Sequence, residues 1–136
     1  MKPEYSSQHI MSLPTGTVVR VSHGWYDHVA LLGDRRINGE RSVISFSAKD
    51  GGFVEQPYSA FSLGRQVTSD GYFGGLPSAA VMQRARLKQG VPYSWIDFNC
   101  EHFVRYAHGV QIESPQVKQW VTLGSVACFA LLAFRG

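Results

Sequence analysis

The chain has 136 residues, 44% of them hydrophobic and 17% charged, so it can close one hydrophobic core and is too short for two full domains. Its formal charge of +3 rests on 13 scattered lysines and arginines, of which only Arg35 and Arg36 are adjacent. This weak, dispersed charge does not make a nucleic-acid footprint, and no nucleic-acid partner is expected. Two cysteines, Cys100 and Cys128, are too few for a disulfide scaffold and form no zinc pattern. Free thiols in a reducing compartment are expected, with no metal and no cofactor.

The N-terminal stretch MKPEYSSQHIMS has no apolar run after Lys2. A cleaved secretory signal is therefore not expected, and residues 1–12 are interpreted as a polar leader. The expected location is cytoplasmic, with membrane association coming from the other end of the chain.

Strands are predicted in the first half of the chain. Residues 15–23 are rich in β-branched side chains after a Pro-Thr-Gly turn, and residues 26–34 are apolar and close at a Gly-Asp turn. The two segments are expected to pair as neighbours. Residues 41–48 alternate, with Ile44 and Phe46 on one face and the intervening residues on the other, which is typical of a half-buried strand.

Helices are predicted in the second half. Residues 53–76 mix aromatic side chains, glycines and polar groups, which indicates a short strand and an ordered loop. A helix then follows with Ser78 as its N-cap and Gly90 as its stop. From Cys100, apolar residues recur at i, i+3, i+4 and i+7, which predicts a second helix that ends at Gly109. Strands followed by helices predict an α+β fold.

The C-terminal segment 120–134 carries no charge and is bracketed by Lys118 and Arg135. It is shorter than the roughly 20 residues that a membrane-spanning helix needs. We interpret it as a helix that dips into a membrane surface. A terminal helix packed on the core or on another subunit, and a tilted single span, are the alternatives.

The segment DFNCEHFVRYAHG, residues 97–109, raises the question of what Cys100 does. A cysteine on an apolar helical face is usually a small hydrophobic side chain. In the first turn of a helix, however, unpaired N–H groups and the positive end of the helix dipole stabilise a thiolate and can hold an oxyanion. Cys100 is therefore a candidate nucleophile, provided that a base lies nearby.

Three of the five histidines are poorly placed to act as that base. His102 lies about 200° around the helix from Cys100, and His108 lies about two turns away. His9 belongs to the polar leader and is expected to be solvated.

His28 is the preferred candidate, because it interrupts an apolar strand in which a titratable ring needs a partner. A neutral core histidine bonded to the backbone is the alternative interpretation. His23, at the far end of the preceding strand, is the second choice.

The segment NCEHFV, preceded by PYSWIDF and followed by RYAHG, closely resembles the signature of the lecithin:retinol acyltransferase-like proteins, which include the H-Ras-like suppressor phospholipases. The upstream segment LPTGTVVRVSHGWYDHVALLGD resembles the first hairpin of that family, in which a Tyr-x-His precedes an apolar strand. Several family members also carry a hydrophobic C-terminal segment. The resemblance extends over residues 13–134.

This resemblance implies a circularly permuted papain-like fold, related to the NlpC-type cell-wall peptidases, in which an antiparallel sheet packs against the helix that carries the cysteine. It implies that Cys100 is the nucleophile and His28 the base. By the period of two, Tyr26 shares a strand face with His28, where it either supports the ring or the oxyanion or simply packs. Residues 13–119 are then the catalytic domain and residues 120–136 a hydrophobic segment.

One departure from the family concerns the third residue of the site. The family commonly has a further histidine in a segment like VVHLA, and the corresponding stretch here is VISFS. Ser45 stands in its place, with Ser47 on the same face, and a serine holds an imidazole more weakly than a ring or a carboxylate does. Either a dyad suffices, or residues 53–76 supply the third group, or catalysis is slower or the substrate different.

The expected function is a thiol-dependent lipid acyl hydrolase or acyltransferase that forms an acyl-thioester on Cys100 from phospholipid, by phospholipase A1/A2 or acyl-transfer chemistry. The segment 120–134 would bring it to a membrane surface. Alternatives are a cysteine peptidase or amidase of the NlpC-like type, including a toxin or effector, and a non-catalytic membrane-binding or partner-binding module. The sequence gives no expectation for the oligomeric state.

Overall fold

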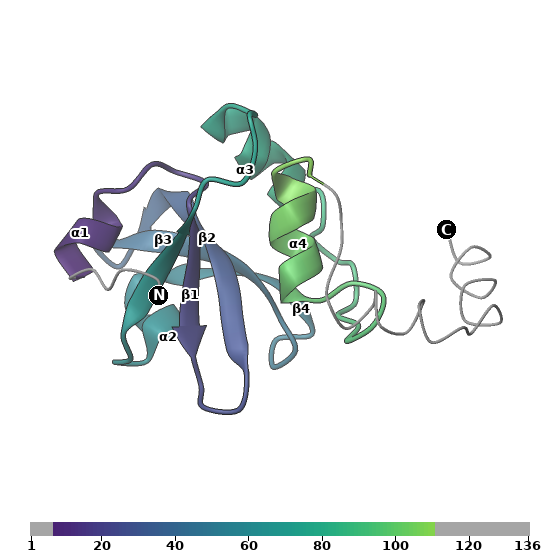
Figure 1. Ribbon diagram of the computed structural model, residues 1–136, viewed down its shortest axis with the longest axis horizontal. Helices are drawn as coiled ribbons and strands as arrows, with labels where there is room; N and C mark the ends of the chain where they lie inside the picture. The colour runs from purple at the N-terminus through teal and green to yellow at the C-terminus, as the bar shows by residue number, and fades with distance from the viewer. Residues whose placement is uncertain (1–6, 111–136) are drawn as a thin grey trace, which may run out of the picture.

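The computed structural model describes residues 7–110, which form a five-stranded antiparallel sheet with helices packed against it (Figure 1). The elements are α1 (Ser7–Met11), β1 (Val18–Ser22), β2 (Asp27–Ile37), β3 (Glu40–Ser47), β4 (Gly52–Pro57), α2 (Tyr58–Ser62), β5 (Val67–Gly71), α3 (Ser78–Arg86) and α4 (Cys100–Ala107). The strand order in the sheet is β4-β3-β2-β1-β5. The predicted α+β class is confirmed, as is the packing of the Cys100 helix on an antiparallel sheet.

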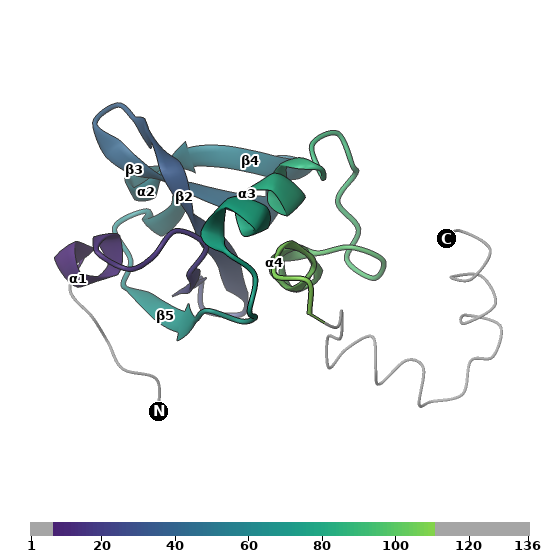
Figure 2. The ribbon, with the colours of Figure 1, turned by 90° about the horizontal axis from the view of Figure 1, so that it is seen from above.

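The two faces of the sheet are covered by different helices. Val29 and Leu31 of β2 pack with α3 and α4 in one core cluster, and Ala30 and Leu32 pack with α1 and α2 in another. This division follows from the alternation of side chains along a strand. Figures 1 and 2 show α3 and α4 on the opposite side of the sheet from α1 and α2.

This second layer corrects the prediction for β3. The strand was expected to be half-buried, yet residues 42–46 are all buried, because α1 and α2 cover the face opposite Ile44 and Phe46. The polar residues Ser42 and Ser45 therefore lie inside the protein.

The turn predicted at Gly33 and Asp34 is also wrong, since β2 continues through both residues to Ile37. The chain reverses instead at Asn38 and Gly39, whose φ angles are 52° and 79°. Positive φ at both central residues is the geometry that Asn-Gly favours in a two-residue hairpin turn.

Gly33 allows a close approach between β2 and β3 and does not form a turn. A Cβ atom at this position would lie 2.1 Å from the Ser42 hydroxyl on the neighbouring strand. The pairing of β2 with β3 shifts register between Leu32 and Arg36, which marks an irregularity in the ladder. A glycine inside a strand is typical of such a close backbone approach.

Residues 53–76 contain more structure than predicted, namely most of β4 together with α2 and β5. The predicted N-cap of α3 is wrong, because Pro77 occupies the N-cap position, without a side-chain cap, and Ser78 is the first helical residue. The Ser78 hydroxyl donates to the Thr15 carbonyl at 2.6 Å. The helix ends at Arg86, short of the predicted stop at Gly90.

The segment 1–12 was interpreted as a polar leader, but residues 7–11 form helix α1 and Ile10 is fully buried. Within residues 7–110 no helix is long and apolar enough to cross a membrane. The hydrophobic segment 120–134 and Cys128 lie outside the described residues.

Candidate active site

Helix α4 begins at Cys100 because Asn99 caps it. The Asn99 side-chain oxygen accepts hydrogen bonds from the N–H groups of Glu101 at 3.0 Å and His102 at 3.2 Å. In return, Nδ1 of His102 accepts from the Asn99 N–H at 3.2 Å, which completes a capping box. The predicted position of Cys100 in the first turn of a helix is confirmed.

Cys100 lies at the edge of the apolar face of α4. Phe103, Val104 and Ala107 are fully buried, and Cys100 is partly buried against the same core cluster. The thiol is therefore in contact with the core and also reaches the surface of a pocket.

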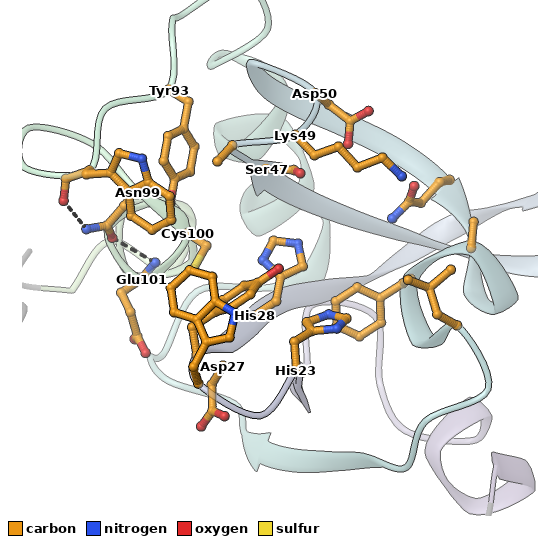
Figure 3. Close-up of a pocket in the computed structure, with 18 residues that line it drawn as sticks. His23, Asp27, His28, Ser47, Lys49, Asp50, Tyr93, Asn99, Cys100 and Glu101 are labelled. Atoms are coloured by element: carbon orange, nitrogen blue, oxygen red, sulfur yellow. Dashed lines mark hydrogen bonds between the residues drawn. The ribbon is translucent and has the colours of Figure 1, made fainter.

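That pocket, of about 530 Å³, is lined by both Cys100 and His28 (Figure 3). Its walls come from the β1–β2 turn, the β3–β4 turn, α2, the loop before α4 and the start of α4. The two residues enter it from different elements, Cys100 from α4 and His28 from β2.

The pocket forms where β2 and β3 separate. Their pairing ends at Ala30 and Ser45, while β2 extends three residues further, to Asp27. Val29 lies in this stretch, which pairs with β1 but not with β3, and its backbone hydrogen-bonds to the Cys100 thiol. The gap between the strands thus brings the sulfur next to the residue that follows His28.

His28 itself shares its strand face with Ala30, and its ring lies 5.6 Å from that of Phe61 in α2. Burial is the main reason why the pKa of His28 falls to about 4. Burial also raises the pKa of Cys100, against a smaller opposing effect of the Val29 hydrogen bond. At neutral pH the two groups are therefore a thiol and a neutral imidazole, and the neutral ring can accept a proton.

Tyr26 lines the pocket but is placed differently from the prediction. It precedes β2 and belongs to the β1–β2 turn. Its ring stacks on His23, with centroids 5.1 Å apart, and lies 4.4 Å from Trp25. His23, the second choice for the base, lines the pocket as well.

Ser45 does not hold His28 in this structure. It lies opposite Ala30 in the ladder, is fully buried, and its hydroxyl has no hydrogen-bond partner among residues 7–110. Ser47, two residues further on, does line the pocket.

Tyr93 is the pocket residue that the sequence reasoning missed. The backbone N–H of Cys100 lies close enough to its hydroxyl to favour the phenolate, yet burial dominates and raises the pKa of Tyr93 to about 12. Figure 3 shows this hydroxyl directed towards Cys100 and Asn99. Tyr93 is in the segment PYSWIDF, which has no periodicity from which its direction could be inferred.

A cluster of charges fixes the first turn of α4 to the sheet. Arg20 of β1 forms ion pairs with Asp70 at 2.9 Å, Glu101 at 3.1 Å and Asp27 at 3.2 Å. Glu101 follows Cys100 directly, so this cluster restrains the backbone at Cys100. The three carboxylates are far apart in the sequence, which explains why pattern analysis did not group them.

The remaining histidines, His9, His102 and His108, do not line the pocket. His102 belongs to the capping box, and His108 is buried with Nε2 2.7 Å from the Gly16 carbonyl oxygen. His9 is exposed on α1. Among residues 7–110, no three histidine, cysteine or acidic side chains gather closely enough to hold a metal ion.

Comparison with models of known protein families finds no match for this chain, and comparison with curated protein sequences also finds none. The family resemblance therefore rests on the motif around Cys100 and the hairpin that carries His28.

Proposed function

We propose that this protein is a thiol-dependent acyl hydrolase or acyltransferase that takes an acyl group from a phospholipid onto Cys100. The observation that carries the proposal is that Cys100, at the start of a helix, and His28 line one pocket. The family resemblance adds the finer fold assignment, a circularly permuted papain-like domain of the NlpC type.

In the first step, the neutral His28 ring takes the proton of Cys100 as the sulfur attacks the ester carbonyl carbon. The ester C–O bond then breaks, and His28 returns the proton to the leaving alcohol, which is the lysophospholipid. In the second step, water attacks the thioester with His28 again as base, and the free thiol is restored. An alcohol or amine acceptor in place of water gives acyl transfer.

The oxyanion of both steps needs hydrogen-bond donors. The N–H groups of Glu101 and His102 are already bonded to Asn99, whereas the N–H of Cys100 faces the Tyr93 oxygen, which the oxyanion would replace as its acceptor. The Tyr93 hydroxyl lies beside that N–H and stays protonated, because its pKa is about 12. We therefore assign the Cys100 N–H and the Tyr93 O–H as the two donors.

An acyl chain is the substrate group that best suits the inner wall. Ala60 and the buried Phe61 of α2 give the pocket an apolar lining next to His28, whose ring lies 5.6 Å from that of Phe61. Apolar walls with a few converging polar groups are typical of small-molecule sites. The proposed membrane contact through residues 120–134 concerns a segment outside the described residues.

Intact mass spectrometry after incubation with a diacyl phosphatidylcholine tests the proposal. We expect the wild-type protein to gain the mass of one acyl chain, and hydroxylamine to remove it, since thioesters are cleaved by this reagent. Cys100→Ala and His28→Ala should show no adduct. Cys128→Ala is the matched control, because it removes the other thiol and should keep the adduct.

The proposal fails if wild-type protein forms neither an adduct nor a lysophospholipid product. Cleavage of peptide amides by the same protein, lost in Cys100→Ala, would assign the site to a peptidase or amidase instead. An unreactive Cys100 with every substrate would indicate a binding module.

A further inference from the structure

Four of the six large hydrophobic side chains that are exposed among residues 7–110 line the pocket. Trp25 is 81% exposed, Leu63 62% and Trp95 57%, and all three line the pocket. Tyr26 also lines it, and Ile96, 52% exposed, follows Trp95 in the chain. We call these five side chains the rim.

The rim is assembled from three segments that are far apart in the sequence, so a single apolar loop does not account for it. The Trp95 segment is fixed because the Asn99 amide donates to the Trp95 carbonyl at 2.9 Å and Ser94 pairs with Phe98. The turn that carries Leu63 is tied to the end of β1, since Arg65 donates to the Ser22 carbonyl at 3.3 Å. Ordered backbone therefore holds these apolar side chains out in water.

Exposed apolar groups concentrated in one patch mark an interaction surface. We infer that the rim inserts into the surface of a lipid bilayer, with the pocket opening towards the lipid. A protein bound on the rim would cover the pocket that Cys100 lines, whereas a bilayer covers the rim and supplies the substrate. Two of the five side chains are tryptophans and one is a tyrosine, which are the residues enriched at membrane interfaces.

The charges near the mouth indicate insertion driven by apolar contact. Lys49 and Asp50 stand side by side on the β3–β4 turn, and Asp27 and Glu101 are paired with Arg20. Because Arg20 and Lys49 do not balance Asp27, Asp50 and Glu101, the mouth is weakly negative and has no basic cluster that would attract lipid headgroups. Binding to uncharged phosphatidylcholine vesicles should therefore persist when salt is raised.

Fluorescence quenching tests where Trp25 lies. In the full-length variant Trp95→Phe/Trp120→Phe, Trp25 is the sole tryptophan of the three in the chain. We expect phosphatidylcholine vesicles with brominated acyl chains to quench its emission strongly. A chain that co-sediments with these vesicles while Trp25 stays unquenched would overturn the inference and assign binding to another segment.

Vesicle partitioning provides a second, independent measurement. The variant Trp25→Ser/Trp95→Ser should bind vesicles at least roughly ten-fold more weakly than the wild-type chain, because two large apolar side chains are removed from the contact. Leu87→Ser is the matched control, since Leu87 is 65% exposed but does not line the pocket. Equal partitioning of the rim variant and this control would contradict the inference.

The inference rests on the proposed function only for the direction in which substrate enters, and the two can fail separately. The wild-type chain is also incubated with a water-soluble short-chain ester, and thioester formation is read by intact mass. Quenching of Trp25 without a thioester would support the lipid surface and refute the acyl enzyme. A thioester without quenching would overturn the lipid surface and leave the acyl enzyme standing.

Discussion

The two ends of α4 each carry a buried histidine, but they serve different purposes. At the C-terminal end, His108 binds the Gly16 carbonyl at 2.7 Å and Arg84 donates to the Tyr106 carbonyl at 2.9 Å, so the helix is fastened to neighbouring segments. At the N-terminal end, His102 and Asn99 satisfy each other within the capping box. The thiol and N–H of Cys100 are thereby left facing the pocket.

The comparison shows how one short helix can be anchored at one end while its other end presents the proposed nucleophile. Because its far end and its apolar face are fixed in the core, the first turn can present a group to solvent without fraying. The predictions below separate the two contributions, beginning with the largest expected effect.

Tyr93→Phe tests the chemistry of the N-terminal end. The variant keeps the ring, which packs 5.2 Å from Trp95 and 5.9 Å from Phe46, but removes the hydroxyl beside the Cys100 N–H. We expect thioester formation to slow about 10²–10³-fold with KM nearly unchanged, the usual cost of losing one oxyanion donor. Stopped-flow kinetics with a chromogenic ester measures this.

Tyr72→Phe is the matched control for that experiment. The Tyr72 hydroxyl donates to the Leu76 carbonyl, outside the pocket. Its loss should leave the acylation rate unchanged. Full activity in Tyr93→Phe would show that the Tyr93 hydroxyl is not a donor to the reaction.

The pH dependence of acylation tests the protonation state of His28. Since burial lowers its pKa to about 4, the ring stays neutral and able to accept a proton well below pH 6.5. We expect kcat/KM for a soluble ester to be nearly flat from pH 7 to pH 5 and to fall about ten-fold per pH unit below about pH 4. An inflection near pH 6.5 would contradict this.

Stability provides the control for the pH experiment. Between pH 6.5 and about 4 the unfolded chain binds a proton at His28 that the folded chain does not, so the free energy of unfolding falls as the pH falls through this window. In His28→Gln this part of the pH dependence should disappear. Denaturant titrations at several pH values would measure both proteins and show the range in which they are folded.

Asn99→Ala should affect stability and chemistry together. Removal of the cap costs about 1 kcal/mol of unfolding free energy. Because the same amide holds the Trp95 carbonyl and the cap positions the turn that carries Cys100, we expect acylation to slow about ten-fold as well. A variant that loses stability but acylates at the wild-type rate would show that the cap does not position the thiol.

His108→Leu should lower stability and leave the acylation rate unchanged, so it is the variant with the smallest expected effect on chemistry. It leaves the buried Gly16 carbonyl without its partner, at a cost of about 1–3 kcal/mol. The acylation rate per folded molecule should stay at the wild-type value. A slower rate in fully folded His108→Leu would mean that the two ends of α4 are coupled.

The sequence predicted the parts of the fold that local pattern determines. The spacing of apolar residues from Cys100 and the alternation in residues 41–48 each indicated the right element. The turn at Gly33 was misplaced because a glycine in a strand can indicate a turn or a close approach to a neighbour, and only the position of Ser42 decides between them.

The residues of the candidate site also fall into those that the sequence could predict and those that it could not. Cys100 could be selected because it lies in the first turn of a predicted helix, and His28 because a titratable ring inside an apolar strand needs a partner. Tyr93 and the Arg20 cluster could not, because their roles arise from contacts between segments that are distant in the chain. That the Ser45 hydroxyl has no hydrogen-bond partner among residues 7–110 likewise depends on the packing around it.

The short helix α1 has a practical consequence for making shortened versions of the protein. Ile10 is fully buried, and the Arg41 guanidinium donates to the carbonyls of Met11 at 2.7 Å and Leu13 at 2.6 Å. An expression plasmid designed to start at Leu13 would delete both the buried isoleucine and one of these acceptors. Affinity tags and fusion partners are therefore better joined ahead of Ser7, so that α1 and the buried Ile10 stay packed against the sheet.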